Sequence, residues 1–347
     1  MTKNGNIIRV LLVDDSSLVR DMIRTILESD SGIAVVGEAS NGMEAIAKVA
    51  ALKPDIVTMD IEMPVMGGLE AIERIIADNP VPILVVTALT GVRTAFSAVS
   101  KGALDVIEKP DISLENVRQL IKKIRLLAKV DVAAHLQAMK GQAGATGISR
   151  VPARKNIAQG GIVAIAASTG GPQAIHTILS QLPAHFPLPI VITQHIAEGF
   201  TQGMVDWLNT GTPLAVTVAG NGDLLAAGHV YVNPAEHSMR ITEQGMVILG
   251  ARDSRHVYHP SCNTLLTSVA AAYKHQVIGL IMSGMGDDGV TGMQAIKTAG
   301  GITLAQDAKS SVVYGMNRLA VERGFIQKIV PLASIPAELI LQAGITR

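Results

Sequence analysis

The sequence has few cysteines, few aromatic residues and no excess of either charge. Cys262 is the single cysteine among 347 residues, so no internal disulfide can form, which is typical of a reducing compartment. Aromatic residues make up only 3% of the chain, which disfavours the stacking surfaces that bind single-stranded nucleic acids. The 29 lysines and arginines are balanced by 29 aspartates and glutamates, so no chain-wide basic surface for nucleic acid is expected.

Long hydrophobic runs are missing too. Although 48% of the residues are apolar, no uncharged apolar stretch reaches the roughly 18 residues of a membrane span. The chain also does not open with a basic segment followed by an apolar segment and a cleavage site. These absences predict a cytoplasmic protein that neither inserts into a membrane nor binds nucleic acid.

Apolar, strand-like segments alternate with amphipathic helical patterns in the first part of the chain. The expected strands cover residues 7–14, 34–39, 55–60, 82–88 and 105–109. Apolar residues at three- and four-residue spacing predict helices over residues 16–27, 42–52, 68–77 and 114–127. Five strands that alternate with helical segments predict a flavodoxin-like, doubly wound parallel sheet, whose ligands bind beyond the carboxyl ends of the strands.

A second α/β domain is expected after a change of composition. Residues 129–158 are rich in alanine, glycine, glutamine and basic residues, and are interpreted as a linker between domains at 1–128 and 159–347. Strand-like segments then resume at residues 161–168, 188–195, 214–219, 229–234, 246–250, 277–284, 301–307 and 325–330. They predict a second doubly wound domain with a largely parallel sheet. Its connectivity is expected to be more mixed where three strands have little helix between them, at 214–250.

Three carboxylates follow strands of the first domain. Asp14 and Asp15 end the first expected strand and Asp60 ends the third, and these strand ends are neighbours in a doubly wound sheet. Carboxylates that converge in this way repel one another unless a cation such as Mg²⁺ binds them. Thr87 and Lys109 end the fourth and fifth strands and add a hydroxyl and an ammonium group to the same rim. The first two aspartates could instead simply cap the helix that follows them.

With these five positions, residues 7–127 resemble the receiver domain of response regulators. The resemblance implies that a histidine kinase phosphorylates Asp60, that the carboxylates hold Mg²⁺, and that the rim hydroxyl and ammonium groups contact the phosphoryl oxygens. It also implies a cis peptide bond at Lys109–Pro110. Gly67 replaces a common aspartate, and Val106 stands where receivers commonly carry a switching aromatic residue.

A serine interrupts the apolar run AIAASTGGPQAI at residues 164–175. The residues before Ser168 are typical of a buried strand and Pro172 suits the first turn of a helix, so the serine lies where strand becomes helix. His195 follows the expected strand LPIVITQ, and Asp288 lies in a glycine-rich turn after another strand. In a parallel sheet all three would lie at one edge, where Ser168 could pass its proton to His195 and Asp288 could fix the imidazole tautomer.

An oxyanion site is suggested by the glycine-rich turn GMGDDG at residues 284–289. Its glycines let backbone N–H groups approach a ligand closely, so the Met285 amide could donate to a developing oxyanion. Each residue taken singly also has a structural explanation, because serines cap helices, histidines pack in cores and aspartates form Asx turns. The serine also lacks a Gly-x-Ser-x-Gly context, since Ala166 holds the position of the first glycine.

The segments ASTGGP, QHI and SGMGDDGVTGM, after a receiver-like domain, resemble the chemotaxis protein-glutamate methylesterase family (CheB type) along nearly the whole chain. Ser168, His195 and Asp288 match that family's catalytic triad. Thr169 matches the neighbouring hydroxyl, and Met285 matches the oxyanion donor. The resemblance implies a hydrolase site without a cofactor, in which the serine attacks a glutamate γ-methyl ester on a methyl-accepting chemotaxis receptor. Some relatives also deamidate receptor glutamines by the same route.

The match is imperfect at the rim of the expected cleft. After the VYV strand the family commonly has Pro-Gly-x-x-His, whereas Ala235 replaces the glycine and Ser238 stands in the histidine position. The common Arg-Pro-Ser-Val-Asp reads HPSCN, with His259 and Asn263 replacing the arginine and the aspartate. These departures leave the identity of the receptor more open than the chemistry.

Two rival functions stay open at this point. His256, His259 and Cys262 are spaced by threes with His237 upstream, and such residues can bind zinc, although Pro260 argues against a helical presentation. Alternatively, the altered rim is consistent with a phosphorylation-gated receptor-binding module whose esterase site is vestigial.

Overall fold

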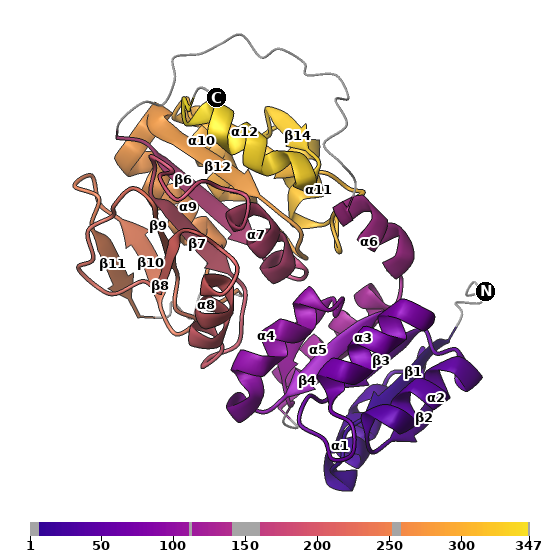
Figure 1. Ribbon diagram of the computed structural model, residues 1–347. Helices are drawn as coiled ribbons and strands as arrows, with labels where there is room; N and C mark the ends of the chain where they lie inside the picture. The colour runs from indigo at the N-terminus through magenta and orange to yellow at the C-terminus, as the bar shows by residue number, and fades with distance from the viewer. Residues whose placement is uncertain (1–6, 111–112, 141–159, 252–257, 346–347) are drawn as a thin grey trace. The chain divides into compact units, whose positions relative to one another are not determined.

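The computed structural model describes residues 7–110, 113–140, 160–251 and 258–345 (Figure 1). The chain divides into two compact units, Met1–Leu136 and Gln137–Arg347, and each unit has its own parallel sheet. None of the helices within the described ranges combines the length and the apolar character that a bilayer crossing requires.

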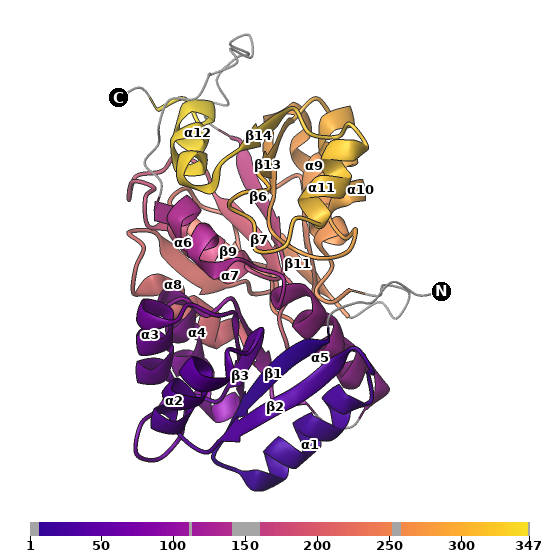
Figure 2. The same cartoon turned by 90° about the vertical axis from the view of Figure 1, so that its right-hand side faces the viewer.

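A five-stranded parallel sheet forms the centre of the first unit, in the order β2-β1-β3-β4-β5. Its strands are β1 (Ile8–Val13), β2 (Ile33–Ala39), β3 (Ile56–Met59), β4 (Ile83–Thr87) and β5 (Asp105–Glu108). Its helices are α1 (Ser17–Glu28), α2 (Gly42–Leu52), α3 (Gly68–Asp78), α4 (Val92–Ser100) and α5 (Leu114–Leu127). Helices α1 and α5 cover one face of the sheet, and α2, α3 and α4 cover the other (Figure 2). This is the flavodoxin-like order that the sequence predicts.

Local sequence explains most of these elements. All four residues of β3 are buried, as expected for a central strand covered on both faces. Helices α1 and α2 begin at side-chain caps, where Ser16 accepts from the Val19 N–H and Asn41 accepts from the Glu44 N–H. The sequence pattern does not predict α4, which follows Gly91 without a side-chain cap and is held by tertiary packing.

A seven-stranded sheet forms the centre of the second unit, in the order β14-β13-β12-β6-β7-β9-β8. Its strands are β6 (Ile162–Ala167), β7 (Ile190–Gln194), β8 (Ala215–Val218), β9 (His229–Val232), β12 (Val277–Ile281), β13 (Ile302–Gln306) and β14 (Lys328–Val330). Its α-helices are α7 (Gly171–Leu179), α8 (Thr201–Asn209), α9 (Cys262–Tyr273), α10 (Val290–Thr298), α11 (Met316–Glu322) and α12 (Ile335–Gln342). Helices α9, α10 and α11 lie on one side of the sheet, and α7 and α12 lie on the other (Figure 2). The described residues also form short 3₁₀ turns: η1 (Leu89–Gly91), η2 (Lys274–Gln276) and η3 (Leu332–Ser334).

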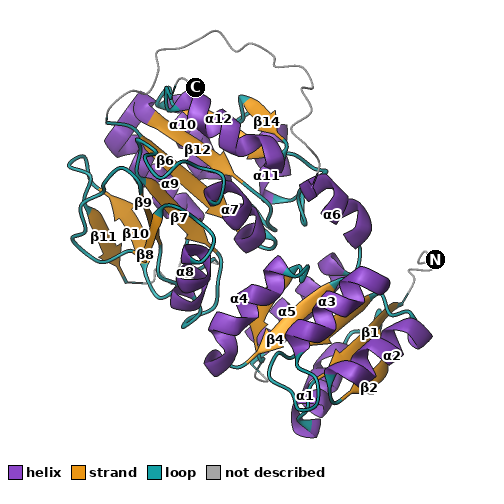
Figure 3. Cartoon of the chain, in the orientation of Figure 1, coloured by secondary structure: helices purple, strands orange, loops and turns teal. Residues whose placement is uncertain are grey.

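Antiparallel pairing occurs in a separate two-stranded ribbon of β10 (Ser238–Ile241) and β11 (Val247–Gly250) (Figure 3). Every neighbouring pair in the seven-stranded sheet is parallel. Of the three strands expected between 214 and 250, β8 and β9 join the main sheet and β11 joins the ribbon. The pattern does not predict β10, because a short segment containing one arginine is a weak strand signal.

The segment interpreted as a linker begins with a helix, α6 (Val132–Lys140). Val132 and His135 are buried, so this part of the segment packs against other residues. Residues 141–159 lie outside the described residues. The domain limits at 128 and 159 therefore stay predictions.

Gly68, at the start of α3, offers a test of packing in the first unit. A Cβ at this position would lie 2.0 Å from the Asp60 carbonyl oxygen, whereas a Cβ at Gly67 would lie 3.2 Å from the Ile61 carbonyl oxygen. Because a backbone oxygen cannot move without displacing the end of β3, we expect Gly68→Ala to lower the free energy of unfolding by about 1–3 kcal/mol. The control Gly67→Ala should cost less than about 1 kcal/mol. Denaturant unfolding followed by circular dichroism compares the two, and equal losses would contradict this packing.

Candidate active site

Ser168 lies at the turn from β6 into α7. The residue is buried, and its backbone N–H donates to the Ser283 carbonyl at 3.0 Å. The Gly171 N–H donates to the Ser168 carbonyl at 2.7 Å and closes a tight turn. Gly170 has a φ of +79°, and a Cβ there would lie 2.6 Å from Val312. Glycine is therefore required two positions after the serine, and the turn is fixed by its backbone contacts.

His195 begins the loop after the neighbouring strand. Strands β6 and β7 pair with Ala167 opposite Gln194, and the His195 N–H donates to the Ala167 carbonyl at 3.0 Å. Ser168 follows Ala167 and His195 follows Gln194, so the two residues leave neighbouring strands, about 4.8 Å apart, at the same level of the sheet. The register of the sheet places the two backbones side by side.

A buried glutamine joins these two turns. Gln194 Nε2 donates to the carbonyls of Ser168 and His195, both at 2.9 Å. A Cβ at Gly171 would lie 2.0 Å from Gln194 Oε1, so the first turn of α7 packs directly on this amide. Gln194 belongs to the QHI segment, but a polar residue at a strand end is not distinctive enough for the sequence to reveal its role. It links the carbonyls of the serine and the histidine.

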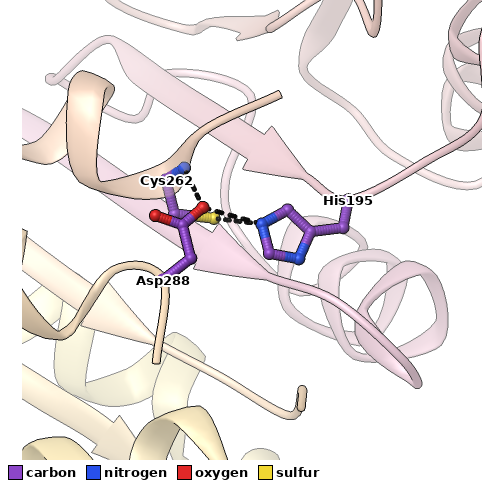
Figure 4. A group of neighbouring side chains, drawn as sticks. All are labelled: His195, Cys262 and Asp288. Atoms are coloured by element: carbon purple, nitrogen blue, oxygen red, sulfur yellow. Dashed lines mark hydrogen bonds and ion pairs between the residues drawn. The ribbon is translucent and has the colours of Figure 1, made fainter. Parts of the chain in front are cut away.

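Asp288 reaches His195 from the loop between β12 and α10. Strand β12 pairs with the other edge of β6, with Ile281 opposite Ala166. Oδ2 of the buried Asp288 lies 2.8 Å from His195 Nε2 (Figure 4). The three candidate residues thus follow three adjacent strands, at the point where the strand order of the sheet reverses. Ligands of doubly wound sheets bind at such a point.

The N-terminus of α9 holds the Asp288 carboxylate. The backbone N–H groups of Cys262 and Asn263 donate to it at 2.6 and 2.9 Å, and the hydroxyl of Ser261, which caps α9, donates at 3.2 Å. Burial raises the pKa of Asp288, but the hydrogen bond and charge of His195, together with these backbone N–H groups, bring the pKa below its ordinary value. The carboxylate is therefore ionised at neutral pH.

Asn263 has a second contact that the sequence did not reveal. Its Oδ1 accepts from the N–H groups of Gly289 and Gly292 at 3.0 and 2.9 Å, at the start of α10. The residue interpreted as a departure at the cleft rim therefore joins the first turns of α9 and α10 around Asp288. An amide makes this connection without placing a second negative charge beside the first.

The hydrogen bond to Asp288 decides which ring nitrogen of His195 is available as a base. An ionised carboxylate can only accept, so Nε2 carries the proton and Nδ1 has the lone pair. Figure 4 shows the second ring nitrogen on the side of the ring away from Asp288. The assignment is the reverse of the serine-protease arrangement, in which Nδ1 faces the aspartate.

Two side chains near the start of α9 contact the imidazole. The Tyr258 ring stacks on His195 with ring centroids 5.3 Å apart and planes inclined by 4°. The Cys262 thiol lies 3.5 Å from His195 Nε2 and donates to the Thr193 carbonyl at 3.6 Å. Burial, followed by the charge of Asp288, raises the pKa of this thiol well above its ordinary value, so the thiol is neutral. The sequence does not predict either contact, because both join segments far apart in the chain.

The segment Gly284–Met285 passes beside the serine. A Cβ at Gly284 would lie 2.7 Å from Ser168 Cβ. Thr169 is buried, and its carbonyl accepts from the Ser283 hydroxyl at 2.7 Å. The structure thus brings the segment of the expected oxyanion donor, and the expected neighbouring hydroxyl residue, to the serine turn.

Of the residues that the structure describes, those suggested by the sequence as a zinc site do not converge, apart from Cys262, on this site. Ser238 is buried at the start of β10, opposite Gly250 in the ribbon. Within the described ranges Cys262 converges with His195 and Asp288, not with His237 or His259, and His256 lies outside those ranges. The zinc set suggested by the sequence is therefore not assembled among the residues that are described.

A second constellation lies at the carboxyl edge of the first sheet. Carboxylate oxygens of Asp14, Asp15 and Asp60 lie within 4.8 Å of one another. Lys109 Nζ lies 2.8 Å from Asp14 Oδ2 and 2.8 Å from Asp60 Oδ2. Burial raises the pKa of Asp14. Burial alone would lower the pKa of Lys109, but the hydrogen bonds of its ammonium group to Asp14 and Asp60 outweigh burial and raise that pKa. Three carboxylates that converge on one point are the hard oxygen ligands that suit Mg²⁺.

The other receiver positions lie near this cluster or on β5. Thr87 is buried at the end of β4, and a Cβ at Gly91 would lie 2.7 Å from its hydroxyl. Val106 is partly buried in β5 and packs against the core. The expected cis bond at Lys109–Pro110 is wrong, because the cis bond among the described residues is His259–Pro260. The lysine reaches both carboxylates from the end of β5 with the trans bond that such sequences intrinsically favour.

Comparison with known proteins identifies both units. A family model described as CheB methylesterase matches residues 163–339, and one described as response regulator receiver domain matches residues 10–125. A protein-glutamate methylesterase/protein-glutamine glutaminase of Paramagnetospirillum magneticum is 47% identical over 342 residues, which cover 97% of this chain and 96% of that protein. The chain belongs to the CheB methylesterase family.

Two further similarities support this membership. A protein of Pyrococcus abyssi with the same enzyme name is 36% identical, covering 98% of this chain and 95% of that protein. The crystal structure of the Thermotoga maritima CheB methylesterase catalytic domain covers 53% of this chain and 98% of that chain, with 35% identity and a TM-score of 0.51. The family resemblance seen in the sequence is confirmed. A receiver domain in a CheB family member also implies the Mg²⁺-dependent phosphorylation site usual for such domains.

Asp288→Asn tests the buried charge through the pH dependence of stability. Because the pKa of Asp288 is lower in the folded than in the unfolded chain, its ionisation stabilises the fold above about pH 4. This contribution is lost as the pH falls through the folded-state value. We expect the wild type to have the larger free energy of unfolding at neutral pH, with a difference that shrinks as the pH falls below about 4. Urea unfolding of both proteins across this range checks it, and a difference that grows in acid would contradict the assignment.

Proposed function

We propose that this CheB family member hydrolyses glutamate γ-methyl esters on methyl-accepting chemotaxis receptors, with Ser168 as nucleophile and His195 as base. The observation that carries the proposal is the 2.8 Å hydrogen bond between His195 Nε2 and Asp288, beside the Ser168 turn. The relatives' names, which combine methylesterase and glutaminase activities, support acyl chemistry at a glutamyl side chain. The same steps acting on a glutamine would release ammonia in place of methanol.

Acylation begins when Ser168 Oγ attacks the carbonyl carbon of the ester and its proton moves to Nδ1 of His195. The carbonyl oxygen becomes an oxyanion, and Asp288 stabilises the positive charge of the imidazolium. When the intermediate collapses, the bond to the methoxy group breaks and Nδ1 returns the proton to it. Methanol leaves, and the glutamyl group remains esterified to the serine.

Deacylation repeats these steps with water. Nδ1 of His195 takes a proton from a water molecule, whose oxygen attacks the glutamyl ester carbon. Collapse of the second intermediate breaks the bond to Ser168 Oγ, which recovers its proton from the imidazolium. The products are a free glutamate side chain and the unmodified serine.

The oxyanion is proposed to accept from the backbone amide of Met285, with Thr169 as the neighbouring hydroxyl. The close approach of Gly284 to Ser168 Cβ supports this assignment. A glycine on this segment lets its backbone come near the reacting carbon without a side chain in between. A fixed N–H donor aimed at the oxyanion stabilises the charge that develops in the transition state.

Ser168→Ala separates this hydrolase from the alternative, a phosphorylation-gated receptor-binding module with a vestigial esterase site. We expect the loss of the nucleophile to reduce methanol release from methylated receptor membranes by on the order of 10⁴-fold or more. Ser180→Ala, the same change at an exposed serine after α7, should leave methanol release at the wild-type rate. Methanol release by Ser168→Ala at the wild-type rate would overturn the mechanism. Receptor-dependent output without any methanol release by the wild type would favour the alternative.

Phosphorylation of Asp60 by a histidine kinase is proposed to control the hydrolase. Asp14, Asp15 and Asp60 would hold Mg²⁺, which when bound neutralises charge on the phosphoryl group. Lys109 already lies 2.8 Å from the Asp60 carboxylate and, with Thr87, would contact the phosphoryl oxygens. These assignments draw on the cluster of opposite charges at the edge of the first sheet, in which Asp14 and Asp60 are buried.

Asp60→Asn tests this control, since an amide cannot form an acyl phosphate. We expect a small-molecule phosphodonor with Mg²⁺ to raise methanol release by the wild type, and to leave the rate of Asp60→Asn unchanged. Chelation of Mg²⁺ should remove the stimulation of the wild type. Asp78→Asn, at an exposed position in α3, should respond as the wild type does. Stimulation of Asp60→Asn equal to that of the wild type would contradict the assignment.

A further inference from the structure

The Cys262 thiol has no part in the proposed hydrolysis, yet it lies beside the catalytic imidazole. Its sulfur is 3.5 Å from His195 Nε2, and the same nitrogen is 2.8 Å from Asp288 Oδ2. One ligand atom from each of these three residues lies within 4.8 Å of the other two, and Figure 4 shows all three side chains directed at one point. Thiolate, imidazole and carboxylate are the ligand types that bind zinc in proteins.

The separations suit a tetrahedral ion. Zinc with bonds of about 2.0–2.1 Å to nitrogen and about 2.3 Å to sulfur separates these two ligand atoms by about 3.5 Å. The observed distance between His195 Nε2 and Cys262 Sγ is 3.5 Å. The distance between Nε2 and Asp288 Oδ2 would have to open from 2.8 Å to about 3.4 Å. The ion would then take the place of the proton in the hydrogen bond between His195 Nε2 and Asp288 Oδ2.

The charges also balance. Cys262 and Asp288 are both almost completely buried, so an uncompensated cation would be costly at this place. A divalent ion that binds one thiolate and one carboxylate forms a group with no net charge. Binding releases one proton, from the thiol, and the imidazole proton moves from Nε2 to Nδ1.

We propose that His195, Cys262 and Asp288 form an inhibitory site for a soft divalent cation such as Zn²⁺. An ion on Nε2 leaves the imidazole proton on Nδ1, so His195 cannot take the proton of Ser168, and it also separates His195 from Asp288. The inhibition rests on the proposed catalytic role of His195, whereas the binding of the ion does not. A hard ion such as Mg²⁺ prefers oxygen ligands, so it should not compete with Zn²⁺ for this site.

Cys262→Val is the matched control, because valine is the residue of the common family motif at this position and cannot bind a metal. With the full-length protein and saturating Mg²⁺ in every sample, we expect Zn²⁺ to abolish methanol release by the wild type. Each protein is compared with its own rate in the absence of zinc. Cys262→Val should need at least about tenfold more Zn²⁺ for half-inhibition, and a chelator should restore the wild-type rate.

Cd²⁺ provides a readout that is independent of turnover. Its bond to a thiolate gives a charge-transfer band in the ultraviolet. The wild type and Ser168→Ala should both give this band, at one Cd²⁺ per chain, and Cys262→Val should not. Cys262→Ser, which keeps a small polar side chain, should also lack the band. Circular dichroism confirms that each variant is folded.

Equal sensitivity of the wild type and Cys262→Val to Zn²⁺ would mean that the ion acts elsewhere, and would overturn the proposal. A wild type that binds no Cd²⁺ through its thiol would overturn it as well. If the zinc-free wild type releases no methanol but gives the Cd²⁺ band, the proposed hydrolase function fails while the metal site stands. The two failures are therefore distinguishable.

Discussion

The burial of the Asp288 charge at the start of α9 is the constraint on which the candidate active site depends. A carboxylate is costly to remove from water, and here the backbone N–H groups of Cys262 and Asn263 and the hydroxyl of Ser261 replace the lost hydration. These donors are fixed by the helix, so the carboxylate has one position. His195 takes its orientation and its tautomer from that position, so the nitrogen with the lone pair, Nδ1, is the one directed away from the acid.

The order of the strands explains how residues so far apart in sequence share one site. Strand β6 is flanked by β7 and β12, so the turns after these three strands open at the same edge of the sheet. Ser168, His195 and Asp288 each occupy one of those turns. Two backbone hydrogen bonds, from the Ser168 N–H to the Ser283 carbonyl and from the His195 N–H to the Ala167 carbonyl, fix the candidate catalytic residues to the register of the sheet. The geometry is therefore a property of the sheet more than of the loops.

The sequence alone predicted the elements whose signals are local. The buried strands are recognisable as apolar runs, and α1 and α2 begin at side-chain caps. Helix α4 and strand β10 depend on tertiary contacts, so the sequence does not predict them. The candidate triad could be inferred because strand ends of a parallel sheet converge. The roles of Gln194, Tyr258 and Cys262 could not be inferred, because their contacts with the turns of Ser168 and His195 are set by packing across the fold. Which imidazole nitrogen faces the acid is likewise a matter of side-chain direction, on which spacing along the chain has no bearing.

The two units hold buried carboxylates in contrasting ways, and the difference follows from what each charge must do. In the first unit a flexible side chain, Lys109, neutralises Asp14 and Asp60, and remains partly exposed. Such a partner can shift when a phosphoryl group and a metal ion change the charge of the cluster. In the mechanism proposed for the second unit the charge of Asp288 stays constant through every step, and rigid backbone dipoles hold it. A mobile side-chain counter-ion would let His195 move, and the proposed proton transfer from Ser168 requires His195 to be positioned to within a fraction of an ångström.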